Sequence, residues 1–263
     1  MRREADVGGA ETVSALLGAG DPAPVVARVS DPGPPVLVVC DHAGRAVPRK
    51  LGRLGLPDRV FDTHIAWDIG ALGYATGLAD RLGCALFAQT YSRLVIDCNR
   101  DPAHPASVPE VSDRIFVPGN KGLSQAARKA RIDEIHAPYH AALAAEIDRR
   151  LAAGDRPLLI CAHSFTPKLQ HDVRPWHVSV LHGGRSPASE TLLRLLRDEG
   201  DLVVGDNEPY AMDGTDYTAP VHAWARGLDV VELEVRQDLI ADAAGQARFA
   251  DLFARLLPRA ADG

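Results

Sequence analysis

Short apolar runs recur along the chain and predict buried β-strands. The run PVLVVC at 35–40 is rich in β-branched residues and bounded by turn-forming residues, which is typical of a strand buried on both faces. Similar runs lie at 84–89, 94–98, 157–162, 177–181, 201–205 and 229–235. Between these runs, apolar residues repeat at helical spacings and predict helices over about 65–82, 123–153, 187–199 and 238–257.

Strands that alternate with helices indicate an α/β fold. We expect a single domain with a mixed, mostly parallel sheet and helices on both faces. The sequence has no internal repeat, low-complexity tract or linker that would divide it. Residues 1–34 are predicted as an N-terminal arm, with a short helix from Glu11 to Leu17 and a connector rich in Gly, Pro and Asp. The domain itself is therefore expected over residues 35–263.

The composition narrows the class of protein and of partner. Of the 263 residues, 46% are hydrophobic, which is enough for a substantial core. The formal net charge of −6 leaves no broad cationic surface for nucleic acid. No run approaches the ~18 apolar residues of a membrane span, and the N-terminus lacks the apolar stretch of an export signal. We expect a soluble protein with no nucleic-acid or membrane partner, and its oligomeric state is left open.

The cysteines favour a reducing compartment. No two of them have CxxC spacing, and each lies in or beside an apolar run. They are Cys40, Cys84, Cys98 and Cys161. Such residues are typical of reduced thiols in a core, so we expect a cytoplasmic location.

Two histidines follow apolar runs and are candidate metal ligands. His42 comes after the run at 35–40, and His163 comes after the run at 157–162. A catalytic zinc site uses three protein ligands and leaves one position for water, so a third ligand is needed. The segment DTHIAWDIG at 62–70 offers carboxylates at what we predict to be a helix start, where aspartates also cap helices. His64 and Asp68 are four residues apart and would share a helix face, so His64 could be an outer partner.

The segment YSRLVIDCNRD at 91–101 carries polar residues around an apolar strand. Arg93 and Asp97 would point to one face of a regular strand, and Asn99 and Arg100 would lie at its end. One interpretation is a structural ion pair between Arg93 and Asp97. The other is a guanidinium fork that binds a substrate carboxylate through two hydrogen bonds.

Two glutamates alternate with apolar residues in the last strand. Glu232 and Glu234 would form a solvated face if this were an edge strand. In a central strand, one of them would be a candidate general base. Elsewhere, His136 and His140 are four residues apart, but Pro138 should kink or break their helix and the glutamate of an HExxH motif is absent. We assign no metal role to that pair, although His140 could still face the site.

Together these motifs resemble the N-formylglutamate amidohydrolase family, in the branch of short members. The resemblance runs from about Pro35 to Leu239. It rests on DHAGRAVP (41–48), DTHIAWDIG (62–70), SRLVIDCNRDP (92–102), PYH (138–140), AHS (162–164) and VELEVRQDL (231–239). The family is similar in turn to the zinc carboxypeptidase and acylase superfamily, which implies a zinc-carboxypeptidase-like or phosphorylase/hydrolase-like fold.

The resemblance implies a zinc-dependent hydrolase that splits the formamide, or a similar amide, of an acidic amino acid. One zinc ion per chain is expected, although another divalent metal is possible. The superfamily has a glutamate three residues after its first histidine, where this chain has Arg45. The carboxylate ligand must therefore come from elsewhere, with Asp68 the first choice and Asp62 the second.

The resemblance covers His42, His163, Asn99, Arg100 and Glu234, and together with the other polar residues it leads us to one hypothesis for the mechanism. The metal ligands would be His42, Asp68 and His163; the catalytic residues would be Glu234 as general base and His222 at the oxyanion; and the substrate-binding residues would be Arg93, Asn99, Arg100 and His140. His140 is a further candidate for the oxyanion, and both His140 and His222 could equally be ordinary loop histidines.

Three rival functions stay open at this point. A related zinc acylase or carboxypeptidase would share the metal site and act on another N-acyl amino acid or a peptide. A metal-independent hydrolase would use Ser164 or a cysteine as nucleophile, although Ser164 lacks the GxSxG context. A non-catalytic binding protein would keep the fold alone.

Overall fold

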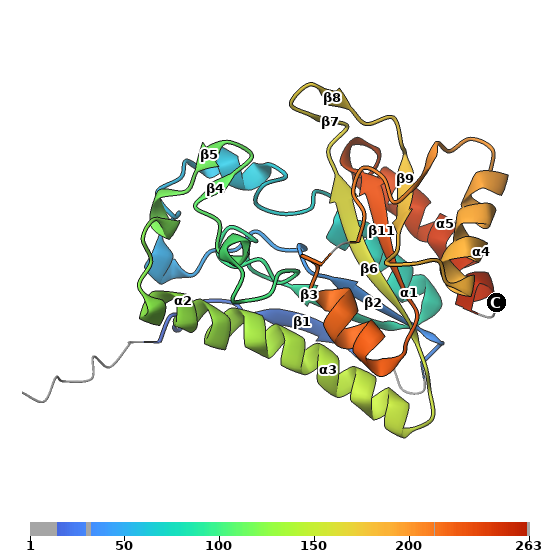
Figure 1. Cartoon of the computed structure of the whole chain (residues 1–263), viewed down its shortest axis with the longest axis horizontal. Helices are drawn as coiled ribbons and strands as arrows, with labels where there is room; N and C mark the ends of the chain where they lie inside the picture. The colour runs from blue at the N-terminus through green and yellow to red at the C-terminus, as the bar shows by residue number, and fades with distance from the viewer. Residues whose placement is uncertain (1–14, 30–32, 213, 262–263) are drawn as a thin grey trace, which may run out of the picture.

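The core of the molecule is a seven-stranded mixed sheet (Figure 1). The computed structural model describes residues 15–29, 33–212 and 214–261. The strand order is β1-β3-β2-β6-β11-β9-β10, with antiparallel pairing only of β1 with β3 and of β9 with β11. The strands are β1 (Val25–Arg28), β2 (Val36–Cys40), β3 (Ala85–Gln89), β6 (Leu158–Phe165), β9 (Val178–Leu181), β10 (Val204–Asp206) and β11 (Val230–Arg236). The predicted mixed, mostly parallel sheet is confirmed.

Helices cover both faces of the sheet, as expected. The helices are α1 (Ala71–Leu82), α2 (Gln125–Arg131), α3 (Ala137–Ala152), α4 (Pro187–Asp198) and α5 (Ala243–Ala261). The buried residues of α1, α4 and α5 pack with one face, and those of α3 pack with the other (Figure 1). Two small hairpins stand apart from the sheet, β4 (Val111–Ser112) with β5 (Ile115–Phe116) and β7 (Lys168–Leu169) with β8 (Asp172–Val173).

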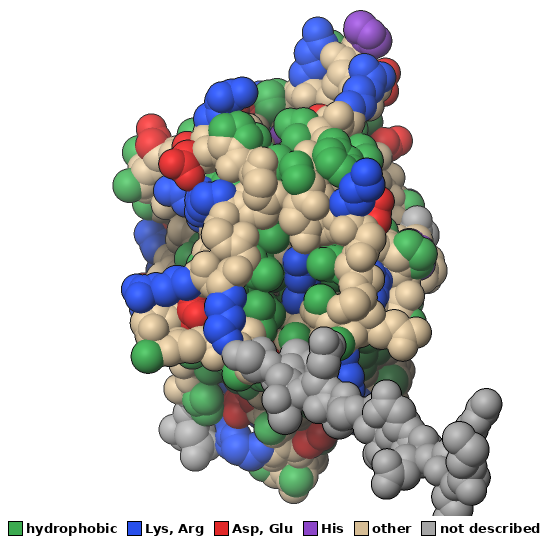
Figure 2. All heavy atoms as spheres, turned by 90° about the vertical axis from the view of Figure 1, so that its left-hand side faces the viewer, with side chains coloured by type: hydrophobic (Ala, Val, Ile, Leu, Met, Phe, Trp, Pro, Cys, Tyr) green, Lys and Arg blue, Asp and Glu red, His purple; other side chains and the backbone are tan. Residues whose placement is uncertain are grey.

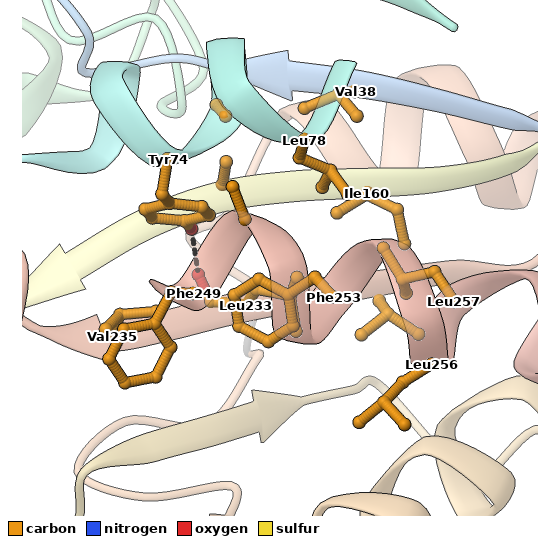
Figure 3. Packing of buried hydrophobic residues seen from close by; sticks show 14 of the residues in the cluster. Val38, Tyr74, Leu78, Ile160, Leu233, Val235, Phe249, Phe253, Leu256 and Leu257 are labelled. Carbon is orange, nitrogen blue, oxygen red and sulfur yellow. Dashed lines mark hydrogen bonds between the residues drawn. The ribbon is translucent and has the colours of Figure 1, made fainter. Parts of the chain in front are cut away.

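A buried tyrosine joins helix α1 to the two central strands. Figure 3 shows Tyr74 above β11, among the apolar side chains of α5 that include Phe249 and Phe253. Its hydroxyl donates to the carbonyl oxygens of His163 at 3.1 Å and Leu233 at 3.2 Å. A buried tyrosine hydroxyl needs such partners. These two hydrogen bonds hold α1 against β6 and β11, the strands that carry His163 and the two candidate glutamates.

The apolar run at 94–98 forms turns, so the prediction of a strand there is wrong. Leu94, Val95 and Ile96 are buried in a hydrophobic cluster that contains no residue of the seven-stranded sheet. Side chains satisfy the backbone in place of a neighbouring strand: Asn120 Nδ2 donates to the carbonyl of Leu94 and Arg131 Nη1 to that of Val95, both at 2.8 Å. A local pattern cannot reveal such distant partners.

The helix predicted over 65–82 begins only at Ala71. Its N-cap is Gly70, which has a φ of 81° and lies so close to Ile240 that a Cβ would come within 2.1 Å of that carbonyl oxygen. The residues before it form turns. Asp68 therefore caps no helix through its side chain, and it shares no helix face with His64, so that expectation is wrong.

The other predicted elements are close to those observed. The helix expected over 123–153 comprises α2, a π-helical turn at Ile132–His136 and α3, so it is interrupted just before Pro138 rather than broken. The last strand before β11 lies at Val204–Asp206 instead of 201–205. Most of the helix expected from Glu11 to Leu17 falls outside the described residues. Residues 25–28 of the predicted arm form β1 and pair with β3.

The surface carries charges of both signs. On the face that Figure 2 shows, Lys and Arg side chains are scattered among acidic, apolar and neutral ones rather than gathered in one continuous patch. None of the described helices has the length and apolar character needed to cross a bilayer. The cytoplasmic location stays a prediction.

Candidate functional site

The candidate residues meet in a cavity at the carboxyl ends of the central parallel strands. His42 is the second residue after β2, His163 lies near the end of β6, and Glu232 and Glu234 belong to β11 between β6 and β9. The cavity has a volume of about 260 Å³. Its lining comprises His42, His64, Asp68, Arg93, Asn99, Arg100, His163, Ser164, Phe165, Thr166, Leu181, Tyr210, Ala211, Thr215, Asp216, Glu232 and Glu234. Ligand sites of open α/β sheets lie at this edge.

Three buried side chains place their ligand atoms around one point. Asp68 Oδ2 is 2.8 Å from His163 Nδ1 and 3.5 Å from His42 Nδ1. One ligand atom from each of the three lies within 4.8 Å of the others. Tetrahedral zinc with ligands at ~2.0–2.2 Å holds its ligand atoms roughly 3.3 Å apart, so this spacing fits a single small cation.

A carboxylate stands behind each of the two histidines. Asp97 Oδ1 is 2.7 Å from His42 Nε2, and Asp41 Oδ2 is 3.6 Å from His163 Nε2. The Asp41 carboxylate is itself fixed, because Tyr139 and Thr218 both donate hydroxyl hydrogens to its Oδ1. Histidines that bind a metal through one nitrogen commonly donate the other N–H to a carboxylate. The buried His42 Nδ1 has no hydrogen-bond partner among the described residues, which leaves it available as a ligand.

The electrostatics of the cavity favour positive charge. Burial lowers the pKa of both His42 and His163, but the surrounding carboxylates outweigh burial and raise both pKa values above the usual range. Burial opposes ionisation of Asp41, yet His163 and His42 together lower its pKa to about 2. An excess of buried carboxylates over cationic groups is the setting in which a metal ion binds.

Glu234 lies beside His163 in the register of β11 with β6, and its Oε2 has no hydrogen-bond partner among the described residues. Burial and the nearby Asp68 and Glu232 raise its pKa well above the usual range, partly opposed by His163. Burial likewise raises the pKa of Glu232 to about 7. The two glutamates face the same cavity from a central strand, so the edge-strand alternative is excluded.

Arg93 bridges the two aspartates that flank His42. Its Nη2 lies 2.9 Å from Asp97 Oδ2, and its Nη1 lies 3.3 Å from Asp68 Oδ1. The ion pair with Asp97 that the sequence suggested is present, although the segment is a series of turns. This arrangement holds both carboxylates in place and leaves less of the guanidinium for a ligand.

Asn99 and Arg100 line the cavity and both contact Asp216. Arg100 Nη1 donates to Asp216 Oδ1 at 3.2 Å and to the carbonyl of Asn99 at 2.8 Å. Asn99 Nδ2 also donates to Asp216 Oδ1, and its own Oδ1 accepts from the backbone N–H groups of Tyr217 and Thr218. Arg100 Nη2 and Nε make no hydrogen bond within the described chain, so they are free for an anionic ligand.

His140 and His222 lie behind the cavity and do not line it. His140 Nδ1 is 2.8 Å from His222 Nε2, and His140 Nε2 is 2.8 Å from the carbonyl oxygen of Cys98. Burial lowers the pKa of His140 to about 3 and that of His222 to about 4, so both are neutral. We expected His140 and His222 to face the substrate, but neither side chain lines the cavity. The pair instead supports the turn at Cys98, through the contact of His140 with its carbonyl oxygen.

The other candidates from the sequence are placed away from the reacting centre or are engaged. Asp62 is largely exposed and pairs with Arg45, outside the cavity. His64 lines the cavity and lies 3.4 Å from Asp113. Ser164 Oγ donates to the carbonyl of Ile69. The cysteines are buried, and burial raises their pKa values, to about 11 for Cys84 and higher for the others. Neither a serine nor a cysteine nucleophile is favoured.

Sequence reasoning missed the loop after β10. Tyr210, Thr215 and Asp216 line the cavity from this loop, although its run of polar, Gly and Pro residues resembles any surface loop. The available indication was its position, because loops at the carboxyl edge of an α/β sheet commonly carry functional residues.

Comparisons with known proteins agree on one family. The family model described as N-formylglutamate amidohydrolase matches residues 34–241. The crystal structure of a gene product of Agrobacterium tumefaciens is 35% identical, with a TM-score of 0.89, and the match covers 93% of this chain and 97% of that one. N-formylglutamate amidohydrolase from Ralstonia eutropha JMP134 is 20% identical, with a TM-score of 0.70, and the match covers 91% of this chain and 98% of that one. No curated protein sequence matches significantly. The chain therefore belongs to the N-formylglutamate amidohydrolase family.

Proposed function

We propose that the protein is a metal-dependent hydrolase that cleaves the amide of an N-formyl acidic amino acid. The reaction would convert N-formyl-L-glutamate and water into L-glutamate and formate. The observation that carries the proposal is the meeting of His42, Asp68 and His163, each histidine backed by a carboxylate, beside an unpartnered Glu234. Membership of an amidohydrolase family supports the reaction class.

The donor set suits zinc, with one ion per chain. Two imidazole nitrogens and one carboxylate oxygen are ligands that zinc prefers in catalytic sites, where a fourth position stays open, and other divalent metals accept the same set. When bound, the ion would supply Lewis-acid activation of water and of the scissile carbonyl. The chain's own part would be to orient the two histidines: Asp97 is within hydrogen-bond distance of His42, and the Asp41 carboxylate lies 3.6 Å from His163.

Glu234 would serve as the general base and then as the general acid. It would take a proton from the attacking water and pass it to the leaving nitrogen, so that the formyl carbon gains oxygen and loses nitrogen. Burial raises the pKa of Glu234, and a cation bound beside it would oppose that rise.

Arg100 and Asn99 would anchor the carboxylate of the amino-acid part. The uncommitted Nη2 and Nε of Arg100 can form a two-bond contact, and Asn99 holds the backbone of the loop that faces it. We assign Arg93 to positioning Asp68 and Asp97 rather than to direct substrate contact. Fixing the substrate in this way makes the reaction effectively intramolecular.

Metal analysis and a formate-release assay test the proposal together. Purified protein should contain about one equivalent of a divalent metal per chain and lose activity on chelation. Formyl derivatives of glutamate, aspartate and leucine, with N-acetylglutamate, separate the acyl group from the side chain as the feature recognised. Turnover of N-acetyl but not N-formyl substrates would favour a related acylase, and activity that survives complete metal removal would contradict the proposal.

The choice of carboxylate ligand yields a prediction. Asp68→Asn is expected to weaken metal binding by more than the ~10–100-fold typical of losing an outer partner, because a ligand oxygen is lost. Asp62→Asn is the matched control, since Asp62 is exposed and pairs with Arg45, and it should bind metal like the wild type. Metal titration of the two variants checks this ranking, and the reverse order would make Asp62 the ligand.

Arg100 yields a prediction about the substrate. Arg100→Ala should cost about 2 kcal/mol, or roughly thirtyfold in kcat/KM, because a charge-assisted contact is lost. Arg100→Lys should also be impaired, since an ammonium cannot form the planar two-bond contact. The measurement compares N-formylglutamate with its α-amide: wild type should discriminate strongly and Arg100→Ala hardly at all. Equal discrimination by both would leave Arg100 only a structural role, through its bonds to Asp216 and to the Asn99 carbonyl.

A further inference from the structure

Arg174 is a buried guanidinium that no carboxylate neutralises among the described residues. It lies between β8 and β9 and is only 6% exposed. Its Nη1 donates to two hydroxyl oxygens, Tyr210 at 2.8 Å and Thr166 at 3.3 Å. Burying a cation without a counter-charge costs stability. The position of Arg174 therefore does not contribute to stability through an ion pair, which suggests another role for its charge.

Both hydrogen-bond partners of Arg174 face the cavity. Tyr210 and Thr166 line it together with Glu234 and Arg93. The Arg174 guanidinium also lies over the Tyr210 ring, 4.8 Å from its centroid. Two contacts from one residue therefore hold the phenol at the cavity wall.

The Tyr210 hydroxyl still has a hydrogen to donate. Its oxygen accepts from Arg174, and its own hydrogen has no acceptor within the part of the chain that the structure describes. Tyr210 is 44% exposed as a whole, but partial burial and the Glu234 carboxylate still raise its pKa, and Arg174 only partly offsets them, so the phenol stays protonated at neutral pH. A hydrogen bond received from a cation polarises the O–H and makes it a stronger donor.

We propose that Tyr210 donates a hydrogen bond to the carbonyl oxygen of the scissile amide as that oxygen becomes an oxyanion, with Arg174 positioning the phenol. The inference rests on the proposed hydrolysis. As the water oxygen bonds to the acyl carbon, the π electron pair of the carbonyl moves onto its oxygen and the water proton passes to Glu234. Tyr210 keeps its own proton and stabilises the new negative charge. His140 and His222 leave this role open because they lie outside the cavity.

Tyr210→Phe tests the proposal because it removes only the hydroxyl. We expect kcat to fall by ~10²–10³-fold, with KM within a few-fold of wild type and unchanged metal content. The matched control is Tyr91→Phe, which removes a phenol hydroxyl that bonds to the Pro22 carbonyl away from the cavity. That variant should keep the wild-type kcat.

A binding measurement gives a readout that does not depend on turnover. An analogue of N-formylglutamate with a tetrahedral phosphinate in place of the formyl group imitates the oxyanion. Tyr210→Phe should bind it more weakly by about the factor lost in kcat, since such analogues share the interactions of the transition state. Binding of glutamate, which lacks that oxygen, should be unchanged.

Arg174→Gln tests the positioning role. A glutamine retains a neutral donor near Tyr210 and Thr166 but removes the charge, so kcat should fall by less than in Tyr210→Phe. If Arg174 acts through the phenol, the double variant should be no slower than Tyr210→Phe alone. Multiplying losses would show that Arg174 acts independently.

The outcomes separate this proposal from the proposed function. A wild type that releases no formate and hydrolyses no N-acyl amino acid overturns the function, and the role of Tyr210 with it. An active wild type whose Tyr210→Phe variant keeps its kcat and its phosphinate affinity overturns only the role of Tyr210. A loss confined to KM would instead make Tyr210 a substrate-carboxylate contact and contradict the oxyanion role.

Discussion

Glu234→Gln is expected to lower turnover by ~10²–10⁴-fold while the protein keeps its metal and its fold. The amide has nearly the same shape as the carboxyl group but cannot accept the proton of the attacking water. Glu234 sits in the middle of the sheet with an unpartnered Oε2, so the substitution breaks no hydrogen bond that the structure shows. Formate release, metal content and thermal unfolding measured on the same preparation check the three parts of this expectation.

Glu232→Gln is the matched control for that experiment. Glu232 lies two residues earlier on β11, faces the same cavity and is also buried, so the two variants replace the same type of side chain in the same wall. We expect the smaller loss for Glu232→Gln, because Glu234 is the one paired with His163 in the strand register. If the Glu232 variant were inactive and the Glu234 variant active, Glu232 would be the general base instead of Glu234.

His163→Ala is expected to abolish stable metal binding and, with it, all measurable hydrolysis. The variant loses a ligand nitrogen and leaves Asp41 and Asp68 facing each other without the imidazole between them. His42→Ala should behave in the same way. Metal analysis after gel filtration measures this directly, and full metal content in both variants would contradict the site.

A second buried histidine provides the control for His163→Ala. His182 lies outside the cavity and pairs with Asp206 at 2.9 Å, much as His163 pairs with Asp68. His182→Ala therefore removes a comparable histidine–aspartate pair from the protein interior. It should retain about one equivalent of metal, so that metal loss in His163→Ala can be ascribed to the site and not to general loosening of the core.

The sheet and the position of the cavity could be predicted because both follow from local pattern. Continuous apolar runs bounded by turn formers identified β2, β6 and β11, and the rule that ligands bind at carboxyl ends of parallel strands pointed to His42 and His163. The structure places both histidines in one cavity with Asp68 and Glu234. His42, His163 and Glu234 could be predicted because they follow or belong to a strand. Asp68 could be predicted because it lies in a motif of the family.

The predictions that proved wrong concern residues whose structure depends on contacts with partners far away in the sequence. Leu94 and Val95 are apolar and buried like strand residues, yet Asn120 and Arg131 supply the hydrogen bonds that a strand would. His222 stands in an apolar context that any loop could provide, and only the tertiary structure shows that it packs behind the cavity. Hydrophobic periodicity carries no information on such contacts.

The two edge strands of the sheet are short, which limits pairing with a strand of another copy of the chain. β1 has four residues and β10 has three, so each border presents only a brief row of backbone donors and acceptors. Near β10, Asp206 pairs with Arg185 as well as with His182. Short borders flanked by charged side chains are poor templates for an added strand. The apolar central strands are thus shielded from edge-to-edge association, the route by which sheets of this kind aggregate.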